Sequence, residues 1–326
     1  MTFRRFFRNA AIGIAVVGGL FVAFVLVRQH RTFAAPYPDL HASTDPAVIA
    51  RGQYLVHGLA HCVDCHGDRE QSKTAAPGSL IDLTGGHTWK LPFGTVYSKN
   101  ITPDVETGIG RYTDAELARI LRYAVHADGR AVLPFMPYAN LADDDLVAIM
   151  SFLRVQKPVS NAVPENELNF LGSIVLALAI EPKGPTQAPA RTLPPTPTRE
   201  YGDYLANSVG NCVKCHTRLD KKTGELTAPP FSGGSVMESA KTPGKNFITP
   251  NLTPDPTNGW INEWSEDTFV ARLQAGPIHP DSPMPWRAIS RISDDDARAL
   301  YRYLRSLPAA PGGPNPRDLR TIASNR

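Results

Sequence analysis

The chain has 326 residues, enough for about two domains, and its 30 prolines and 25 glycines predict long loops. Its formal net charge is only +3; residues 1–35 contribute five arginines and no acidic residue, so the remaining residues carry a net charge of −2. This balance gives no indication of a basic surface of the kind that binds nucleic acid, and we expect no nucleic-acid partner.

An apolar run lies close to the N-terminus. Residues 10–27 contain no charged side chain and are flanked by arginines on both sides. A run of this length can span a bilayer, and the arginines before it favour a cytoplasmic N-terminus at residues 1–9. A cleaved signal peptide is the alternative, although its apolar stretch is usually shorter. We expect a single-pass inner-membrane anchor, then a polar, proline-containing tether at residues 28–45, with everything after the anchor in the periplasm.

An internal repeat organises the chain beyond the tether. A Gly-x-Tyr-Leu segment occurs twice, with Tyr54 and Tyr204 each eight residues before the next cysteine. Further segments match at nearly constant offsets through both halves. The sequence therefore predicts two copies of one domain, which we name the first repeat (residues 46–160) and the second repeat (residues 199–308).

Helices are predicted at both ends of each repeat. The opening helices lie near residues 46–58 and 199–208, and each contains a glycine that would permit close approach of a crossing helix. The closing helices start at the acidic triplets 143–145 and 294–296, which are expected to supply the N-cap and first-turn negative charge. Apolar residues then follow at helical spacing. Since no alternating strand pattern competes, we expect a mainly α fold.

Each repeat contains one Cys-x-x-Cys-His motif, and the two motifs hold all four cysteines of the chain. Two cysteines at this spacing can form thioethers to the two vinyl groups of one haem, while the adjacent histidine binds the iron. A thioredoxin-like redox pair would need a βαβ setting, and a zinc site would need four ligands converging on one metal. We therefore predict two covalently bound haem c groups. The predicted attachment cysteines and proximal histidines are Cys62, Cys65 and His66 in the first repeat, and Cys212, Cys215 and His216 in the second.

The second iron ligand is predicted to be methionine in both repeats. Met136 and Met284 occupy matched Met-Pro loops ahead of the closing helices. Because proline limits the freedom of the loop, it can hold the soft thioether at a fixed reach. His126 and His279 also occupy equivalent positions, so bis-histidine ligation stays open as an alternative.

A segment of the form Asn-x-Thr-Pro-Asp follows each haem motif, at residues 100–104 and 251–255. Its asparagine and threonine side chains could bind haem propionates or could simply build the turn that the neighbouring proline and glycine demand. Both interpretations are open. Aromatic residues expected to wall the pockets are Trp89, Tyr112, Trp260 and Trp264.

Two segments lie outside the repeats. Residues 161–198 form a proline-rich linker that contains an apolar stretch at residues 168–180, too short to span a membrane. This stretch could form a helix packed between the repeats, or a face that rests on the bilayer or docks a partner subunit. The tail at residues 309–326 is expected to be flexible.

The assembled pattern resembles the membrane-anchored multi-haem cytochrome c subunits of periplasmic dehydrogenases of the alcohol dehydrogenase type. The resemblance implies tandem class I cytochrome c folds, each a small helical bundle around haem. It also implies a periplasmic dehydrogenase or other redox protein as electron donor, and quinone, another cytochrome or a terminal oxidase as acceptor. The segments that carry it are residues 62–66, 100–104, 136–138, 212–216, 251–255 and 284–286.

The expected function is electron transfer without substrate chemistry, since histidine and methionine would close both faces of each iron. The alternative is a di-haem redox enzyme such as a peroxidase, in which one haem would have to lose its distal ligand. A thiolate-ligated thiosulfate-oxidising cytochrome would need a fifth cysteine, which the chain lacks. Both a free carrier and a subunit of a larger oxidoreductase fit the sequence.

Overall fold

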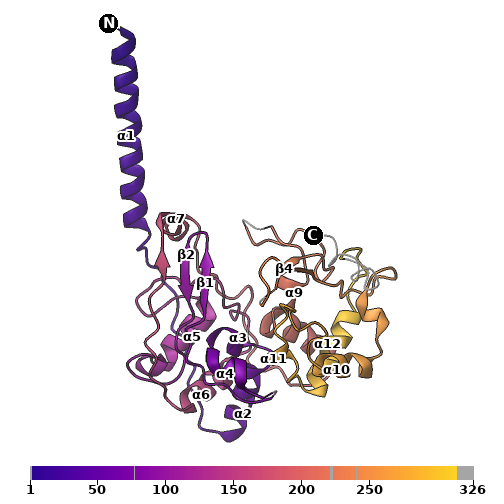
Figure 1. Cartoon of the computed structure of the whole chain (residues 1–326). Helices are drawn as coiled ribbons and strands as arrows, with labels where there is room; N and C mark the ends of the chain where they lie inside the picture. Colours follow the sequence, from indigo (N-terminus) through magenta and orange to yellow (C-terminus); the bar gives the residue numbers. More distant parts are fainter. Residues whose placement is uncertain (1, 77, 221–222, 240, 314–326) are drawn as a thin grey trace.

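The computed structural model describes residues 2–76, 78–220, 223–239 and 241–313. Helix α1 (Thr2–Arg28) projects from the rest of the protein (Figure 1). Among these residues it is the one helix long and apolar enough to cross a membrane. Only 6% of its 18-residue apolar stretch is buried against the rest of the protein. A signal sequence has the same properties. The predicted apolar run is therefore helical, and its role as an anchor stays a prediction.

The predicted opening and closing helices form and pack in pairs. In the first repeat, α2 (Pro46–His57) crosses α6 (Asp143–Val155). In the second, α8 (Arg199–Tyr204) crosses α12 (Asp294–Arg305), and a π-helical turn continues α8 to Val209. The same two-helix crossing thus occurs once in each repeat.

A glycine lies at the centre of each crossing. A Cβ atom added to Gly52 would lie 1.9 Å from the backbone oxygen of Ala148, and one added to Gly202 would lie 2.0 Å from that of Ala299. Real Cβ atoms are never so close to a backbone oxygen, so only glycine lets these helices touch backbone to backbone. The close approach expected from the sequence is confirmed.

The expected capping of the closing helices was wrong in one respect. The N-cap of α6 is Ala142, which makes no side-chain cap, and the N-cap of α12 is Ser293, whose Oγ accepts a hydrogen bond from the amide of Asp296 at 3.2 Å. The aspartates at 143–145 and 294–296 occupy the first turn itself. Their charge still complements the helix dipole there, but they do not cap it.

The structure also contains short strands, so the expectation that no strands compete with the helices was wrong locally. An antiparallel sheet has the order β1 (Thr88–Leu91), β2 (Gly94–Tyr97), β3 (Glu167–Leu168), and β4 (Val236–Glu238) pairs with β5 (Asn246–Ile248). Each strand has two to four residues, too few for alternation to be recognised. The chain nevertheless remains mainly helical.

The remaining helical elements are short. They are α3 (Cys62–His66), α4 (Arg69–Thr74), η1 (Ile109–Arg111), α5 (Asp114–Tyr123), α7 (Phe170–Leu178), η2 (Leu205–Val209), α9 (Cys212–Cys215), η3 (Trp260–Glu263), α10 (Glu266–Gln274) and α11 (Trp286–Ile289). Helix α7 contains most of the apolar stretch of the linker. It contacts α1 and β3 at the foot of α1 (Figure 1), and so does not lie between the repeats.

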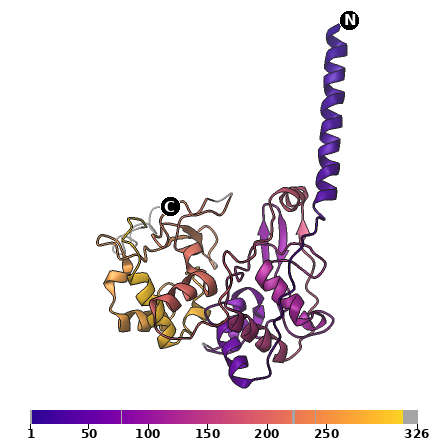
Figure 2. The ribbon, with the colours of Figure 1, turned by 180° about the vertical axis from the view of Figure 1, so that it is seen from behind.

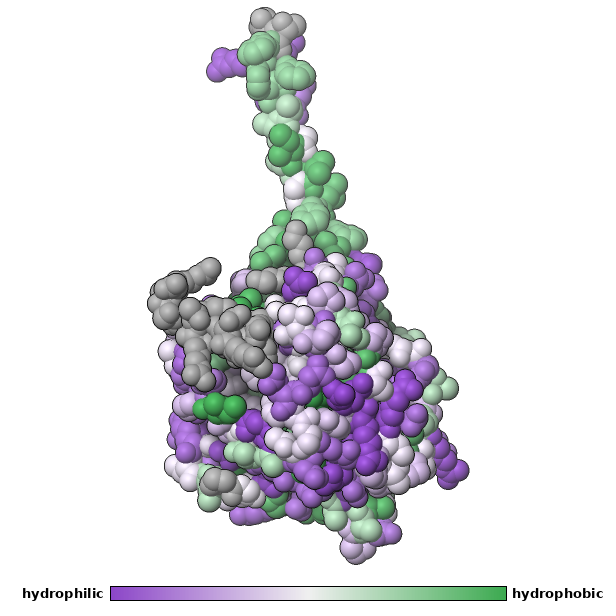
Figure 3. Space-filling model, turned by 90° about the vertical axis from the view of Figure 1, so that its right-hand side faces the viewer, coloured by the Kyte–Doolittle hydropathy of each residue, from purple (hydrophilic) through white to green (hydrophobic). Residues whose placement is uncertain are grey.

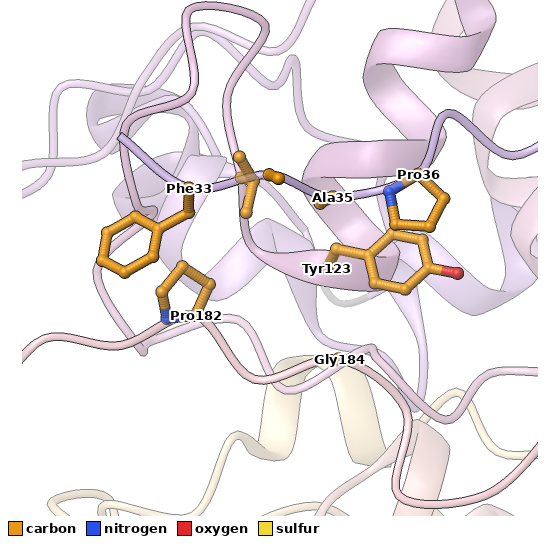
Figure 4. A pocket seen from close by; sticks show the side chains of 8 residues that line it. Phe33, Ala35, Pro36, Tyr123, Pro182 and Gly184 are labelled. Atoms are coloured by element: carbon orange, nitrogen blue, oxygen red, sulfur yellow. The ribbon is translucent and has the colours of Figure 1, made fainter. Parts of the chain in front are cut away.

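The predicted tether is fixed to the first repeat. The amide of Phe33 donates to the carbonyl of Gly129 at 2.8 Å, and the guanidinium of Arg119 lies 4.4 Å from the ring centroid of Tyr37. Tether residues line a small cavity of about 140 Å³ together with Tyr123 and Pro182 (Figure 4). Both the tether and the linker therefore run along the surface of the first repeat.

The tail predicted to be flexible lies mostly outside the described residues, which end at position 313. Its first residues pack on the second repeat, because the carbonyl of Ala310 accepts hydrogen bonds from Asn251 Nδ2 at 2.8 Å and from Thr253 Oγ1 at 3.2 Å. The folded part of the chain thus extends beyond the boundary expected at residue 308.

The repeats lie side by side (Figures 1 and 2), and their buried apolar residues form one continuous cluster. Two tyrosine side chains form hydrogen bonds from one repeat to the other. Tyr54 donates to Asp296 Oδ2 at 2.8 Å, and Tyr204 donates to Asp145 Oδ2 at 2.7 Å. Since these tyrosines and aspartates occupy matching positions in the two repeats, the contacts are related by an approximate two-fold axis.

The same tyrosine hydroxyls also accept hydrogen bonds from backbone amides at the N-termini of the closing helices. The amide of Ser293 donates to Tyr54 at 3.0 Å, and the amide of Ala142 donates to Tyr204 at 3.1 Å. Arg51 lies between these pairs and donates to Asp145 from Nε at 2.8 Å and to the hydroxyl of Tyr201 at 2.9 Å. Each repeat thus supplies a hydrogen-bonding group that the closing helix of the other repeat requires.

Candidate haem sites

The two Cys-x-x-Cys-His segments have closely similar backbones. Each begins a short helix, α3 or α9, immediately after a residue in the left-handed region, His61 with φ 43° and Asn211 with φ 47°. Because the paired cysteines are three positions apart on a helical turn, they lie on the same face. A pair of thiols on one face of a turn is the arrangement that attachment to one planar group requires.

All four cysteines are free thiols. Burial raises the pKa of Cys62 to about 12 and that of Cys212 to about 12, so both remain protonated near neutral pH. In the described ranges no three His, Cys, Asp or Glu side chains gather where they could hold a metal ion. Free, paired thiols are the state from which thioether attachment can proceed.

The histidine of each motif is oriented by a backbone carbonyl. His66 Nδ1 lies 2.7 Å from the carbonyl oxygen of Lys99, and His216 Nδ1 lies 3.3 Å from that of Pro250. Burial lowers the pKa of both imidazoles and outweighs these hydrogen bonds, so both rings are neutral. With the proton held at Nδ1, each ring presents a lone pair at Nε2, as an iron ligand must.

The Asn-x-Thr-Pro-Asp segments build the turns that hold these carbonyls. In the first repeat, Asn100 Oδ1 accepts from the amide of Thr102 at 2.9 Å and from its hydroxyl at 2.8 Å. Asn100 Nδ2 donates to the carbonyl of Val159 at 2.8 Å and to Thr107 Oγ1 at 3.1 Å. The amide group is thus saturated.

The second repeat contains the same turn. Asn251 Oδ1 accepts from the amide and hydroxyl of Thr253 at 2.9 and 2.8 Å, and its Nδ2 donates to Ala310 and Asn258 at 2.8 Å each. Of the two roles that the sequence left open, the structure supports turn building. Because Lys99 and Pro250 immediately precede the asparagines, each turn fixes the carbonyl that orients the histidine.

A glycine in each repeat makes the close approach of this carbonyl possible. The amides of Gly85 and Gly233 donate to the carbonyls of His66 and His216, both at 2.8 Å. Both glycines have positive φ, and an added Cβ would lie 2.5 Å from the backbone of Lys99 or Pro250. The sequence analysis missed both glycines, although each begins a Gly-Gly pair in its repeat that could have identified it.

The predicted methionine ligands lie in partly buried loops against the apolar core. In the first repeat, the hydroxyl of Tyr138 donates to the carbonyl of Ala60 and accepts from Cys62 Sγ at 3.9 Å, which brings the loop of Met136 to the start of α3. In the second repeat, the indole of Trp286 donates to Ser282 Oγ at 3.1 Å and so stiffens the loop of Met284. Both methionines stay predicted iron ligands.

The histidines considered as alternative ligands differ from each other. His126 is partly buried, whereas His279 is exposed and lies 6.2 Å, between ring centroids, from Phe247. Since Met136 and Met284 are both partly buried and packed on the core, the methionine pair matches better than the histidine pair.

The second site also contains a polar atom that is left unpaired. The indole N–H of Trp260 is buried and has no hydrogen-bond partner among the described residues. The backbone amide of Trp260 donates to the backbone carbonyl of Asn251 at 2.8 Å, which places the residue beside the Asn-Thr turn. An unpaired buried donor costs about 1–3 kcal/mol. A carboxylate of a haem bound at this site could accept this hydrogen bond. Free paired thiols, neutral carbonyl-oriented histidines and this donor are together consistent with haem binding.

No family model matches the chain. It is 34% identical over 297 residues, or 86% of its length, to the cytochrome c subunit of alcohol dehydrogenase (quinone) of Gluconobacter oxydans. It is 29% identical over 298 residues, or 87% of its length, to the gluconate 2-dehydrogenase cytochrome c subunit of Pantoea cypripedii. Over 265 residues, 76% of its length, it is 28% identical to a diheme cytochrome c-type protein of Cereibacter sphaeroides.

These alignments cover the relatives to different extents. They span 59% of the Gluconobacter subunit and 64% of the Pantoea subunit, so the chain matches less than two thirds of either dehydrogenase subunit, but 82% of the diheme cytochrome. The resemblance that the motifs indicated is confirmed. The chain is a homologue, over most of its length, of cytochrome c subunits of dehydrogenases and of a diheme c-type cytochrome.

Proposed function

We propose that the chain is a membrane-anchored di-haem cytochrome c that accepts electrons from a periplasmic dehydrogenase. It passes them to quinone, another cytochrome or an oxidase, and performs no substrate chemistry itself. The observation that carries this proposal is the duplicated arrangement of paired free cysteines followed by a histidine whose Nδ1 faces a fixed carbonyl. The printed names of the relatives support a dehydrogenase as the donor.

Each bound haem would supply an iron centre that gains or loses one electron. The residues of the chain would hold it: Cys62 and Cys65, and likewise the second pair, would form the covalent attachment, while the neutral histidine would supply the proximal nitrogen. Met136 and Met284 would close the opposite faces. With both faces closed, no position is open to a substrate, so the site favours electron transfer over catalysis.

The proximity of the two Cys-x-x-Cys-His segments supports the proposal that electrons pass between the two haems. A Cβ atom added to Gly210, two residues before Cys212, would lie 3.1 Å from Leu59 Cδ1, three residues before Cys62. Helix α11 of the second repeat contacts α3, and Arg287 Nη2 donates to the carbonyl of Ser72 at 2.6 Å. The crossed tyrosine contacts hold this arrangement, so we assign the two repeats to one rigid electron-transfer unit.

The anchor is assigned to α1. Its apolar side chains are almost entirely exposed in the isolated chain, which is unfavourable in water and favourable in lipid. With the arginine-rich end in the cytoplasm, the haem sites lie on the periplasmic side of the inner membrane. The assignment is tested by washing membranes at high salt and alkaline pH. The full chain is expected to stay bound, and a chain without residues 1–28 is expected to be released.

The haem assignment is tested by mass spectrometry and redox titration of the purified chain. We expect a mass increase of two haems, two one-electron steps, and in the oxidised protein the weak long-wavelength absorption band of a thioether-to-iron bond. A chain with fewer haems would contradict the count. Rapid peroxide turnover by the half-reduced protein would instead support the enzymatic alternative, because it requires a haem that opens its distal face.

A further inference from the structure

Helix α7 presents an apolar surface at the foot of α1. Three of its nine residues have large apolar side chains that are about half exposed: Phe170 at 46%, Leu171 at 48% and Leu178 at 50%. The helix contains no charged residue. At about 1.5 Å per residue it is roughly 14 Å long, too short to cross a bilayer.

The position of α7 is fixed by α1. Val25 of α1 and Ala177 of α7 are both fully buried, and the two helices are in contact. Arg28 Nε donates to the carbonyl of Ala177 at 2.9 Å, and Arg31 donates to the carbonyl of Ile180 and lies 3.7 Å from Glu181. The last turn of α1 and Arg31, just after it, therefore hold the C-terminal end of α7.

The other side of α7 rests on the hairpin between β1 and β2. Asn169 caps the helix by accepting from the amide of Gly172 at 3.1 Å, and its Nδ2 donates to the carbonyl of Pro92 at 3.0 Å. A Cβ atom added to Gly172 would lie 2.4 Å from the carbonyl oxygen of Phe93. The helix is thus held from two sides, and both supports together still leave its large apolar side chains about half exposed.

The orientation of α7 fits a membrane surface. In Figures 1 and 2 α1 runs up the picture while α7 is seen nearly end-on, so the axis of α7 lies across that of α1. Apolar surface continues from α1 onto the adjoining edge of the globular part (Figure 3). A helix that crosses the end of a spanning helix, beside its terminal arginines, lies in the plane of the lipid headgroups.

We propose that α7 is a membrane-surface helix whose residues Phe170, Leu171 and Leu178 insert into the outer leaflet beside the end of α1. The occupant of this surface is the phospholipid bilayer. The proposal rests on the assignment of α1 as a membrane anchor. Together α1 and α7 give the first repeat two points of contact with the membrane. Its orientation relative to the bilayer is therefore fixed, whereas a single flexible attachment would let it rotate.

The experiment uses the full haem-loaded chain in vesicles of phosphatidylcholine and phosphatidylglycerol. A phospholipid with a photoactivatable diazirine near the headgroup end of its acyl chain is included, and lipid adducts are mapped by mass spectrometry of the digested protein. Adducts are expected on α1 and on residues 170–178. The triple substitution Phe170→Ser, Leu171→Ser and Leu178→Ser is expected to reduce labelling of α7 several-fold and leave that of α1 unchanged.

The matched control is Val105→Ser, a substitution at an apolar residue of the first repeat that is 67% exposed and lies in a turn outside α1 and α7. It is expected to leave the labelling pattern unchanged, and the haem spectrum confirms that both variants are folded. Adducts on α1 without adducts on α7 would overturn the proposal alone and would point to a protein partner on this surface. An absence of adducts on both helices would overturn the anchor as well.

Discussion

The two haem motifs have the same ligand-holding parts and different surroundings. Both begin after a left-handed residue and both place their histidine Nδ1 against a carbonyl held by an Asn-Thr turn. The first distance is 2.7 Å and the second is 3.3 Å, so the first histidine is held more firmly. The parts that orient the two predicted iron-binding histidines are thus duplicated, while the length of the orienting hydrogen bond differs.

The surroundings differ because the two-fold relation between the repeats is only approximate, and α3 is more covered than α9. Asp64 and Cys65 of α3 are partly covered, and α3 contacts α11 of the second repeat. The corresponding residues of α9, Lys214 and Cys215, are exposed. Exposure of a haem to solvent is one of the factors that set its reduction potential. The difference therefore predicts two unequal potentials and easier access for a partner at the second site.

The largest effect is expected when the two cysteines of one motif are replaced. Each double variant, Cys62→Ala/Cys65→Ala or Cys212→Ala/Cys215→Ala, is expected to carry one haem, because no other cysteine can form the thioether. Mass spectrometry and the absorbance of the reduced protein measure the count. Since α3 lies at the contact between the repeats, the first variant is expected to lose more thermal stability than the second. Equal losses would contradict the asymmetry.

Substitution of each predicted methionine ligand tests whether it sets the reduction potential of the haem in its own repeat. Met136→Ala and Met284→Ala are each expected to lower the potential of their own haem by roughly 100 mV, about 2 kcal/mol for one electron, and to leave the other nearly unchanged. A redox titration followed by absorbance resolves the two steps. His126→Ala and His279→Ala are matched controls that should leave both potentials in place. If a histidine variant shifts a potential instead, the bis-histidine alternative is correct.

The repeated segments, the paired cysteines and the glycines at the helix crossings could be read from the sequence because they depend on residue type, while the assignment of the iron ligands stays a prediction. A thiol, an imidazole and a thioether each have few substitutes, and Gly52 and Gly202 have none at a backbone contact. The carbonyls that orient the histidines could not be predicted, because every residue supplies one. Lys99 and Pro250 illustrate this, since their carbonyls perform the same task at matching positions while their side chains are chemically unrelated.

The contacts between the repeats were also invisible in the sequence. Tyr54 and Tyr204 were recognised as markers of the repeat, but each hydroxyl acts on the other repeat, and that depends on tertiary placement. The short strands were missed because two to four residues give no measurable alternation. Local pattern thus predicts what each repeat contains, while packing decides how the repeats meet.

The crossed tyrosines allow the contact between the repeats to be tested from both sides. Tyr54→Phe removes the 2.8 Å hydrogen bond to the carboxylate of Asp296, a residue that is 2% exposed, and leaves the more distant Arg51 Nη1 at 3.9 Å; it is expected to cost about 2 kcal/mol. Tyr204→Phe leaves Asp145 paired with Arg51 Nε at 2.8 Å, and is expected to cost about 1 kcal/mol. Urea denaturation measures both.

The control for this pair is Tyr97→Phe, because its exposed hydroxyl donates to Glu167 at 3.1 Å at the protein surface. Its free energy of unfolding should change by no more than about 0.5 kcal/mol. Equal costs for Tyr54→Phe and Tyr204→Phe would show that Arg51 does not favour Asp145, and the approximate two-fold contact would then be energetically symmetric.

The smallest expected effect is on the pH dependence of stability. Burial raises the pKa of Asp296, and the neighbouring Asp145 and Asp295 add to this, while the hydrogen bond from Tyr54 and the charge of Arg51 oppose it. A carboxyl whose pKa is higher in the folded state favours folding when protonated. Its contribution is present below the ordinary aspartate pKa of about 4 and is lost as pH rises through the raised value. Asp296→Asn should remove this loss, so its stability relative to the wild type should increase with pH across that window. A constant difference in unfolding free energy at all pH values would show that Asp296 titrates normally and that the contact between the repeats stabilises its charge fully.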